Sequence, residues 1–167
     1  IQDNSKLNNK FYNNFINIGN IINGDFMENI NALDEISKGS CMGVDAIDFV
    51  LEKVEDNELK KTLEIERNKY KDIFKKIEDI YPEYNEGEVH KTGVMTKAMT
   101  WYGINMKTLT DHSSSKLAEL LLQGTNMGII EGRRILNNKE LDKQVKNIIS
   151  EYVTMQEDSV EKLKTFL

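Results

Sequence analysis

The chain of 167 residues has few of the residues that staple or interrupt a fold. It has one cysteine, Cys41, which excludes an internal disulfide and a thiolate metal site. It has one proline, Pro82, so long helices can run without interruption. No apolar run approaches the roughly 18 residues that a membrane-spanning helix needs. A cytoplasmic protein is therefore expected.

Clustered basic side chains, which a nucleic-acid surface requires, are also missing. The formal net charge is -6, and only Arg133 and Arg134 form an adjacent arginine pair. The sequence has no glycine-rich phosphate loop and no nucleophile beside a base, so we predict no catalytic residue and favour a non-enzymatic protein. With 30% charged and 39% hydrophobic residues, the composition is typical of one soluble helical domain.

What the chain does contain is a repeated glycine pattern. Residues 39–44 and 124–129 both read glycine, small hydroxyl, any residue, methionine, glycine, β-branched residue. Each copy lies in a run of helical apolar spacing, where a glycine costs roughly 1 kcal/mol relative to alanine. We interpret Gly39, Gly43, Gly124, Gly128 and Gly132 as helix-crossing positions, where two helix backbones come into close contact. Cys41 is read as a small apolar filler between them.

Apolar residues at steps of three and four predict two long helices in the first half of the chain, over about 28–54 and 58–81. Asp56 is placed to cap the second helix, and Pro82 to end it. Because the joint between them is so short, the two helices are predicted to fold back as an antiparallel hairpin.

A crossover is expected next, beginning with the polar stretch 83–93. It is followed by a shorter helix over about 94–109 that carries a wide apolar face. We predict that this face packs against the bundle or forms an interaction surface for another subunit. Its principal residues are Met95, Met99, Trp101, Tyr102 and Met106.

A second hairpin is predicted after the crossover. Its first helix begins at the hydroxyl residues 113–115 and breaks at Asn137, which forms a capping-box pair with Glu140 at the start of the last helix. The two hairpins match beyond the glycines, because Glu58-Leu59 corresponds to Glu140-Leu141 and Tyr70 to Tyr152 at the same offset. This order of matches indicates an internal duplication.

Residues 1–26 differ from the rest by their many asparagines. Leu7, Phe11, Phe15, Ile18 and Ile22 nevertheless fall on one helical face, with Gly24 just past its end, which favours a helical segment that docks on the bundle. The alternative is a non-native leader, with the natural start at Met27. In that case residues 24–26 correspond to a translated ribosome-binding sequence.

Residues 28–167 resemble the ferritin-like superfamily, and within it a bacterial group of four-helix proteins without an assigned activity. The resemblance rests on Asp56-Asn57-Glu58-Leu59-Lys60, on Met106-Lys107-Thr108-Leu109 and on the glycine-centred fourth helix. It implies an all-α, ferritin-like four-helix bundle made of two hairpins joined by a crossover that contains a short helix.

The same resemblance raises the question of a di-metal centre, which in that superfamily uses Glu-x-x-His pairs. The chain has no such pair, since the third residue after Glu66 is Lys69, and Glu151 and Glu157 likewise lack a histidine three positions on. His90 and His112 bracket the crossover helix instead. The usual ligands therefore cannot be assigned to any position.

Several polar residues lie next to the predicted inner stripe. A buried carboxylate must be paired or hydrogen-bonded, so we favour a structural network with arginine and tyrosine partners. The alternative is a carboxylate-only iron or manganese site, with Glu66 and Glu131 as weak candidates. Glu86 and His90 are a second, weaker metal candidate, and a solvent-facing histidine is the commoner arrangement. The possible inner polar cluster consists of Glu66, Tyr70, Glu131, Tyr152 and Gln156.

Three functional hypotheses follow. The leading one is a metal-free, non-enzymatic structural or interaction protein that forms a homo-oligomer and needs no cofactor. A second is a degenerate di-metal oxidoreductase or metal-binding protein. A third is a binder of a small apolar ligand beneath the crossover helix.

Overall fold

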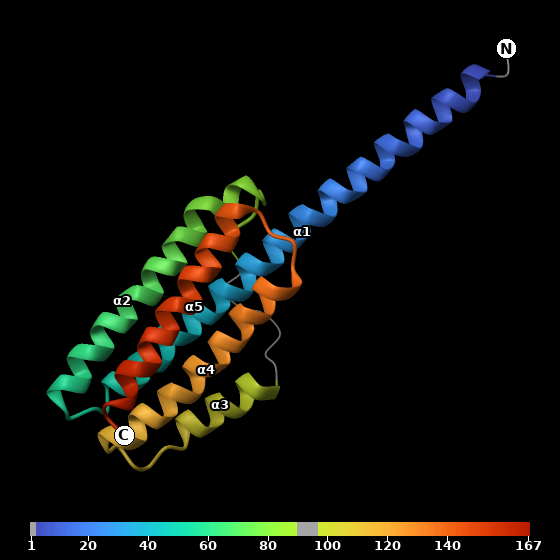
Figure 1. Ribbon diagram of the computed structural model, residues 1–167. Helices are drawn as coiled ribbons and strands as arrows, with labels where there is room; N and C mark the ends of the chain where they lie inside the picture. Colours follow the sequence, from blue (N-terminus) through green and yellow to red (C-terminus); the bar gives the residue numbers. More distant parts are fainter. Residues whose placement is uncertain (1–2, 90–96) are drawn as a thin grey trace.

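The computed structural model describes residues 3–89 and 97–167, with side chains for residues 24–89, 100 and 102–167. The described elements are α1 (Asp3–Leu51), α2 (Asn57–Ile80), a 3-10 turn (Tyr81–Glu83), α3 (Lys97–Lys107), α4 (Ser114–Asn138) and α5 (Lys143–Lys164). Helices α1, α2, α4 and α5 run side by side as a bundle, and α3 lies along the outside next to α4 (Figure 1). The predicted all-α four-helix bundle of two hairpins is confirmed.

The first hairpin is built as the sequence predicts. The Asp56 carboxylate accepts hydrogen bonds from the backbone N–H groups of Glu58 and Leu59, at 2.8 and 2.9 Å. These bonds satisfy two of the donors that a helix N-terminus leaves open, so α2 starts at this point. At the other end, Pro82 sits in the 3-10 turn that follows α2.

The crossover leads into α3 and then into the second hairpin. α3 is shorter than the predicted 94–109 helix within the described residues, and it ends at Lys107. Ser113 caps α4 as expected, because its side chain accepts a hydrogen bond from the backbone N–H of Lys116. Tyr102 and Met106 are buried against the bundle, so these two residues do not form an outer interaction surface. The side chains of Met95, Met99 and Trp101 lie outside the described part.

The joint between α4 and α5 differs from the expected one. Asn137 lies inside α4, and α5 begins only at Lys143, so the predicted capping box with Glu140 is wrong. Instead, α1 supplies the acceptors that hold this joint. The Glu28 carboxylate accepts from the Glu140 backbone N–H at 2.8 Å, and the side-chain Oδ1 of Asn29 accepts from the Asp142 backbone N–H at 2.9 Å. Local sequence spacing could not predict these two hydrogen bonds, because their partners are more than 100 residues apart in the chain.

Helix α1 is also longer than predicted. It runs through Gly24 without a break, so the expected helix end at that glycine and the separate helix start near residue 28 are both wrong. A glycine inside a helix only weakens it, whereas a helix end needs a cap or a left-handed residue, and Gly24 does not have a positive φ. In Figure 1 the first part of α1 extends away from the other helices.

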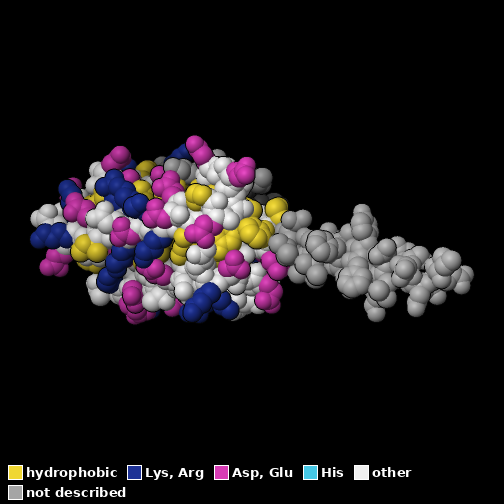
Figure 2. Space-filling view, turned by 90° about the horizontal axis from the view of Figure 1, so that it is seen from above, with side chains coloured by type: hydrophobic (Ala, Val, Ile, Leu, Met, Phe, Trp, Pro, Cys, Tyr) yellow, Lys and Arg dark blue, Asp and Glu magenta, His cyan; other side chains and the backbone are white. Residues whose placement is uncertain are grey.

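An apolar core lies between the four long helices. Its largest fully buried side chains include Leu33, Ile36, Leu63, Ile77 and Ile149, which lie on the predicted inner stripes. On the face shown in Figure 2, acidic and basic side chains are mixed on the surface. None of the helices in the described residues is sufficiently long and apolar to cross a membrane.

Candidate functional site: a cavity at mid-bundle

A cavity of about 520 Å³ lies inside the bundle, and all five helices contribute to its wall. This volume is within the roughly 300–1,000 Å³ of typical small-molecule sites. Most of its wall is apolar, with aliphatic residues such as Ile36, Ile47 and Leu121 and the methionines Met42 and Met127. All members of the predicted inner polar cluster also line it: Glu66, Tyr70, Glu131, Tyr152 and Gln156.

Four of the repeated glycines line the same cavity, but their neighbours are not helix backbones. A Cβ atom added at Gly43 would lie 2.6 Å from the Tyr70 ring, and one added at Gly124 would lie 2.6 Å from the Tyr102 hydroxyl. This corrects the interpretation of the glycines as direct backbone contacts. Glycine suits these positions of α1 and α4 because side chains of other helices occupy the space that a Cβ would take.

The remaining repeated glycines follow the same rule. A Cβ at Gly39 would collide with the Tyr152 hydroxyl, and one at Gly128 would collide with the Gln156 amide. Gly132, outside the cavity wall, accommodates Val153 in the same way. The glycine repeat therefore makes room for large polar side chains at mid-bundle.

Three tyrosines present neutral hydroxyl groups to this space. Tyr70, Tyr102 and Tyr152 are each at most 6% exposed, and burial raises the pKa of each phenol far above its ordinary value. The Tyr70 and Tyr152 rings meet edge to face with centroids 6.4 Å apart. The Tyr70 hydroxyl donates to the Gln156 Oε1 at 3.3 Å. These groups stay protonated at neutral pH, so each of them can donate a hydrogen bond.

Two buried polar atoms at the cavity have no hydrogen-bond partner among the described residues. They are the hydroxyl of Tyr102 and the Nε2 of Gln156. A buried donor that makes no hydrogen bond costs about 1–3 kcal/mol. Both side chains are more than nine-tenths buried, so solvent at the surface does not satisfy them.

One wall of the cavity carries a charged group that we call the Glu66 cluster, consisting of Glu66, Lys69, Ser159 and Lys162. Glu66 is only 2% exposed. Its Oε1 accepts from the ammonium groups of Lys69 and Lys162, both at 2.9 Å, and its Oε2 accepts from the Ser159 hydroxyl. Burial alone would raise the pKa of Glu66, but these three hydrogen bonds together lower it below its ordinary value. The carboxylate is thus charged and fully paired.

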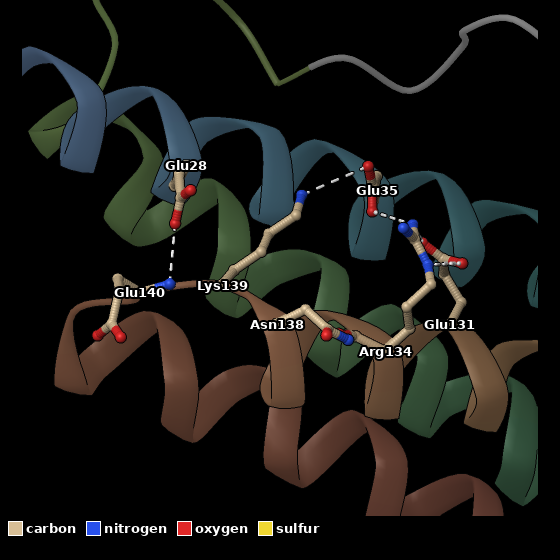
Figure 3. A network of polar contacts seen from close by, with 7 residues as sticks. All are labelled: Glu28, Glu35, Glu131, Arg134, Asn138, Lys139 and Glu140. Carbon is tan, nitrogen blue, oxygen red and sulfur yellow. Dashed lines mark hydrogen bonds and ion pairs between the residues drawn. The ribbon is translucent and has the colours of Figure 1, made fainter.

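A second group, the Arg134 cluster, consists of Glu35, Glu131, Arg134 and Lys139 and joins α1 to α4 (Figure 3). The Arg134 guanidinium binds Glu131 and also donates to the Glu35 carboxylate at 3.4 Å, and Lys139 lies 3.5 Å from Glu35. The hydrogen bond from Arg134 lowers the pKa of Glu131, whereas burial and a hydrogen bond with Glu131 raise that of Glu35. This cluster is more exposed than the first.

These features can now be set beside known proteins. No protein-family model and no curated protein matches the chain. Among solved structures, it is similar to a dodecameric thioferritin, the bacterioferritin-related protein of Bacteroides fragilis. The two chains are 15% identical, with a TM-score of 0.65, and the similarity covers 85% of each. The fold is ferritin-like.

Ferritin-like bundles that carry a di-metal centre use carboxylates and Glu-x-x-His pairs that project inward. Here the residues three positions after Glu66 and Gln156 are Lys69 and Ser159, and both donate hydrogen bonds to Glu66. A protonated ammonium group cannot be a metal ligand, and it occupies the coordinating oxygen instead. These residues do not fit a di-metal centre of that type.

The other metal candidates are less informative. Among the described residues, no group of three or more His, Cys, Asp or Glu side chains is arranged to hold a metal ion. Glu66 and Glu131 line the same cavity, but each is paired with a cation of its own. His90 lies outside the described residues, so the Glu86–His90 pair stays a prediction. Cys41 is half-buried, at the edge of the core.

Sequence reasoning missed Glu35, Ser159 and Lys162 as members of the site. Ser159 had a usable signal, because Gln156 and Ser159 repeat the spacing of Glu66 and Lys69. Lys162 had no such signal, because nothing in the local sequence distinguishes it from a solvent-exposed lysine. Only the approach of α5 to α2 brings it to Glu66.

Proposed function

We propose that this ferritin-like bundle is a metal-free, non-enzymatic protein that binds a small, mostly apolar molecule in its mid-bundle cavity. The supporting observation is the cavity itself, whose wall contains four glycines in place of larger residues. Bundles normally fill their interior, because an empty space of this kind lowers stability. An unfilled volume of this size between packed helices is best explained by an occupant.

The cation pairing around Glu66 supports the metal-free part of this proposal. Two ammonium groups compensate the buried carboxylate that a metal would otherwise neutralise. Iron or manganese chemistry would need free carboxylate oxygens at this point. After loading with iron or manganese, metal analysis should therefore find essentially no bound ion in the protein. Tight binding of two ions per chain with oxygen consumption would contradict the proposal.

A matched pair of variants tests the cavity directly. Thr125 lines the cavity and is buried, whereas its neighbour Asn126 on α4 is exposed. The Thr125 hydroxyl and the Asn126 amide each donate to a carbonyl of their own helix, four residues back, at 2.9 Å. The Thr125 side chain also hydrogen-bonds to the Tyr70 hydroxyl. After Thr125→Leu the Tyr70 hydroxyl keeps its hydrogen bond to the Gln156 Oε1 at 3.3 Å, and Asn126→Leu changes only the exposed side of α4.

The probe is N-phenyl-1-naphthylamine, a neutral apolar fluorophore whose emission rises in a dry site. The wild-type protein and Asn126→Leu should bind it with equal affinity, and Thr125→Leu should lose binding because leucine fills the space. Circular dichroism checks that each variant is folded. Equal binding by all three proteins, or none by the wild type, contradicts a ligand-binding cavity.

Assembly into a homo-oligomer is a second part of the proposal. Ile104 of α3 is 57% exposed, although two other apolar residues of α3 point into the bundle. The similar structure from Bacteroides fragilis is that of a dodecamer. We therefore expect copies of this chain to associate through the outer side of the crossover helix, in the cytoplasm. Light scattering of wild type and Ile104→Glu tests this, and a wild-type monomer at high concentration contradicts it.

A further inference from the structure

The polar groups of the cavity indicate the chemical class of its ligand. We infer that the occupant is a neutral molecule with an apolar body and one acceptor oxygen, such as a ketone or ester carbonyl, which accepts from Tyr102 and Gln156. The inference rests on the proposed ligand-binding function. It follows from which buried atoms lack partners, where they lie, and which charges surround them.

The unsatisfied atoms are donors. The Nε2 of Gln156 is an amide nitrogen, so it can only donate, and the Oε1 of the same amide accepts from the Tyr70 hydroxyl. The Tyr102 hydroxyl has no partner among the described residues, and its raised pKa keeps the proton in place. A ligand that satisfies these two groups must bring an acceptor.

The two donors come from α3 and α5 and approach α4 at positions one helical turn apart. The Tyr102 hydroxyl is the nearest neighbour of the Gly124 position, and the Gln156 amide is that of Gly128. Residues four apart on a helix have Cβ positions about 5–6 Å apart. Two hydrogen bonds of about 2.9 Å cover a separation of that size, so a ligand carbonyl oxygen held over this turn of α4 is within reach of both groups.

The charges around the cavity exclude an ionised ligand. Three carboxylates line it, from Glu35, Glu66 and Glu131, against two cationic residues, Lys38 and Arg134. The oxygens of Glu66 are occupied by lysine and serine, so no free carboxylate is left at the buried wall for a cationic ligand. Arg134 already pairs with Glu35 and Glu131. An anion would therefore meet three carboxylates with only Lys38 to oppose them among the described lining residues, at a large desolvation cost. A neutral acceptor meets neither obstacle.

The experiment compares three probes of equal chain length, which are decane, 2-decanone and decanoate, by isothermal titration calorimetry. The variants are Tyr102→Phe, which removes the donor, and Tyr84→Phe as the control. The Tyr84 hydroxyl bonds to Asp142 and Gln144 away from the cavity. Because the Tyr102 hydroxyl is unpaired in the described structure, its removal should not impair folding.

We expect the wild type and Tyr84→Phe to prefer 2-decanone to both decane and decanoate. Tyr102→Phe should weaken 2-decanone binding by roughly three- to tenfold, the value of one hydrogen bond, and leave decane unchanged. Equal affinity for decane and 2-decanone, unaffected by Tyr102→Phe, overturns the acceptor inference but keeps the apolar-ligand function. Preference for decanoate also overturns it. If no probe binds the wild type, the proposed function itself is wrong.

Discussion

The Glu66 cluster and the Arg134 cluster border one cavity, yet they hold their carboxylates in different ways. The first ties α2 to α5 around a carboxylate that is 2% exposed, with two lysines and one serine donating to it. The second ties α1 to α4 around two half-buried carboxylates that share one arginine. Each cluster thus joins one helix of the first hairpin to one helix of the second.

The difference shows what a buried charge requires. A carboxylate away from water must be neutralised at close range, and Glu66 therefore uses nearly all of its acceptor capacity on protein donors. Glu35 and Glu131 still reach solvent, so two like charges can lie side by side with incomplete pairing. The Glu66 cluster is expected to contribute to stability, and the Arg134 cluster much less.

The largest effect should come from removing the two cations of the Glu66 cluster. The double variant Lys69→Met, Lys162→Met leaves a buried carboxylate with a single hydroxyl donor. We expect it to lower the free energy of unfolding by about 2–3 kcal/mol, somewhat below the usual figure for a buried pair because both lysines are partly exposed. Urea denaturation at neutral pH measures this change.

Arg134→Met is the matched change in the other cluster. Its expected cost is at most about 1 kcal/mol, as for exposed ion pairs. If the two variants lose equal stability, the distinction between the clusters is wrong. A double lysine variant as stable as the wild type would show that Glu66 is reached by water.

A second test compares two helical glycines, Gly43 at the cavity wall and Gly103 on α3 outside it. Gly43→Ala places a Cβ against the Tyr70 ring, which is 5% exposed and cannot move away freely. We expect a loss of about 1–3 kcal/mol, the usual cost of overpacking. Within the described part of the chain, nothing lies within 4 Å of a Cβ added at Gly103 on α3, so Gly103→Ala should instead stabilise by about 0.5–1 kcal/mol.

Thermal unfolding of the two variants beside the wild type makes this comparison. Gly128→Leu, at the Gln156 amide, should behave like Gly43→Ala with a larger loss. Tolerance of alanine at Gly43 would mean that the tyrosine is not held against the helix. The glycines would then need another explanation.

The hairpins, the Asp56 cap and the helical stripes were predictable because they depend on residues close in sequence. Spacing alone also selected Tyr70, Tyr152 and Gln156, which line the cavity together. It did not show that a glycine on α1 faces a tyrosine on α5, since that contact depends on how the hairpins pack. The same limit applies to Lys162 and to the α1 acceptors at the second joint.

The smallest expected effect is in the pH dependence of stability. As the pH rises, the contribution of Glu66 to the free energy of unfolding should increase, whereas that of Glu35 should decrease. Glu66 has a folded-state pKa below its ordinary value of 4.5. Its stabilisation is therefore complete above about pH 4.5 and is lost as the pH falls through the lowered value. Glu66→Gln should remove this part of the acid sensitivity, so its stability approaches that of the wild type on acidification.

Glu35 should behave in the opposite way, because its folded-state pKa is raised above 4.5. Its protonated form is favoured in the folded protein, so this contribution is complete below about pH 4.5 and is lost as the pH rises through the raised value. Relative to the wild type, Glu35→Gln should become more stable over that rise. The lowered pKa of Glu131 opposes the effect in the wild type, which keeps the net slope small. The measurement is the free energy of unfolding of the wild type, Glu66→Gln and Glu35→Gln between about pH 3 and pH 7. Parallel curves for the two glutamine variants would mean that burial and pairing act alike on both carboxylates, and that the clusters differ only in exposure.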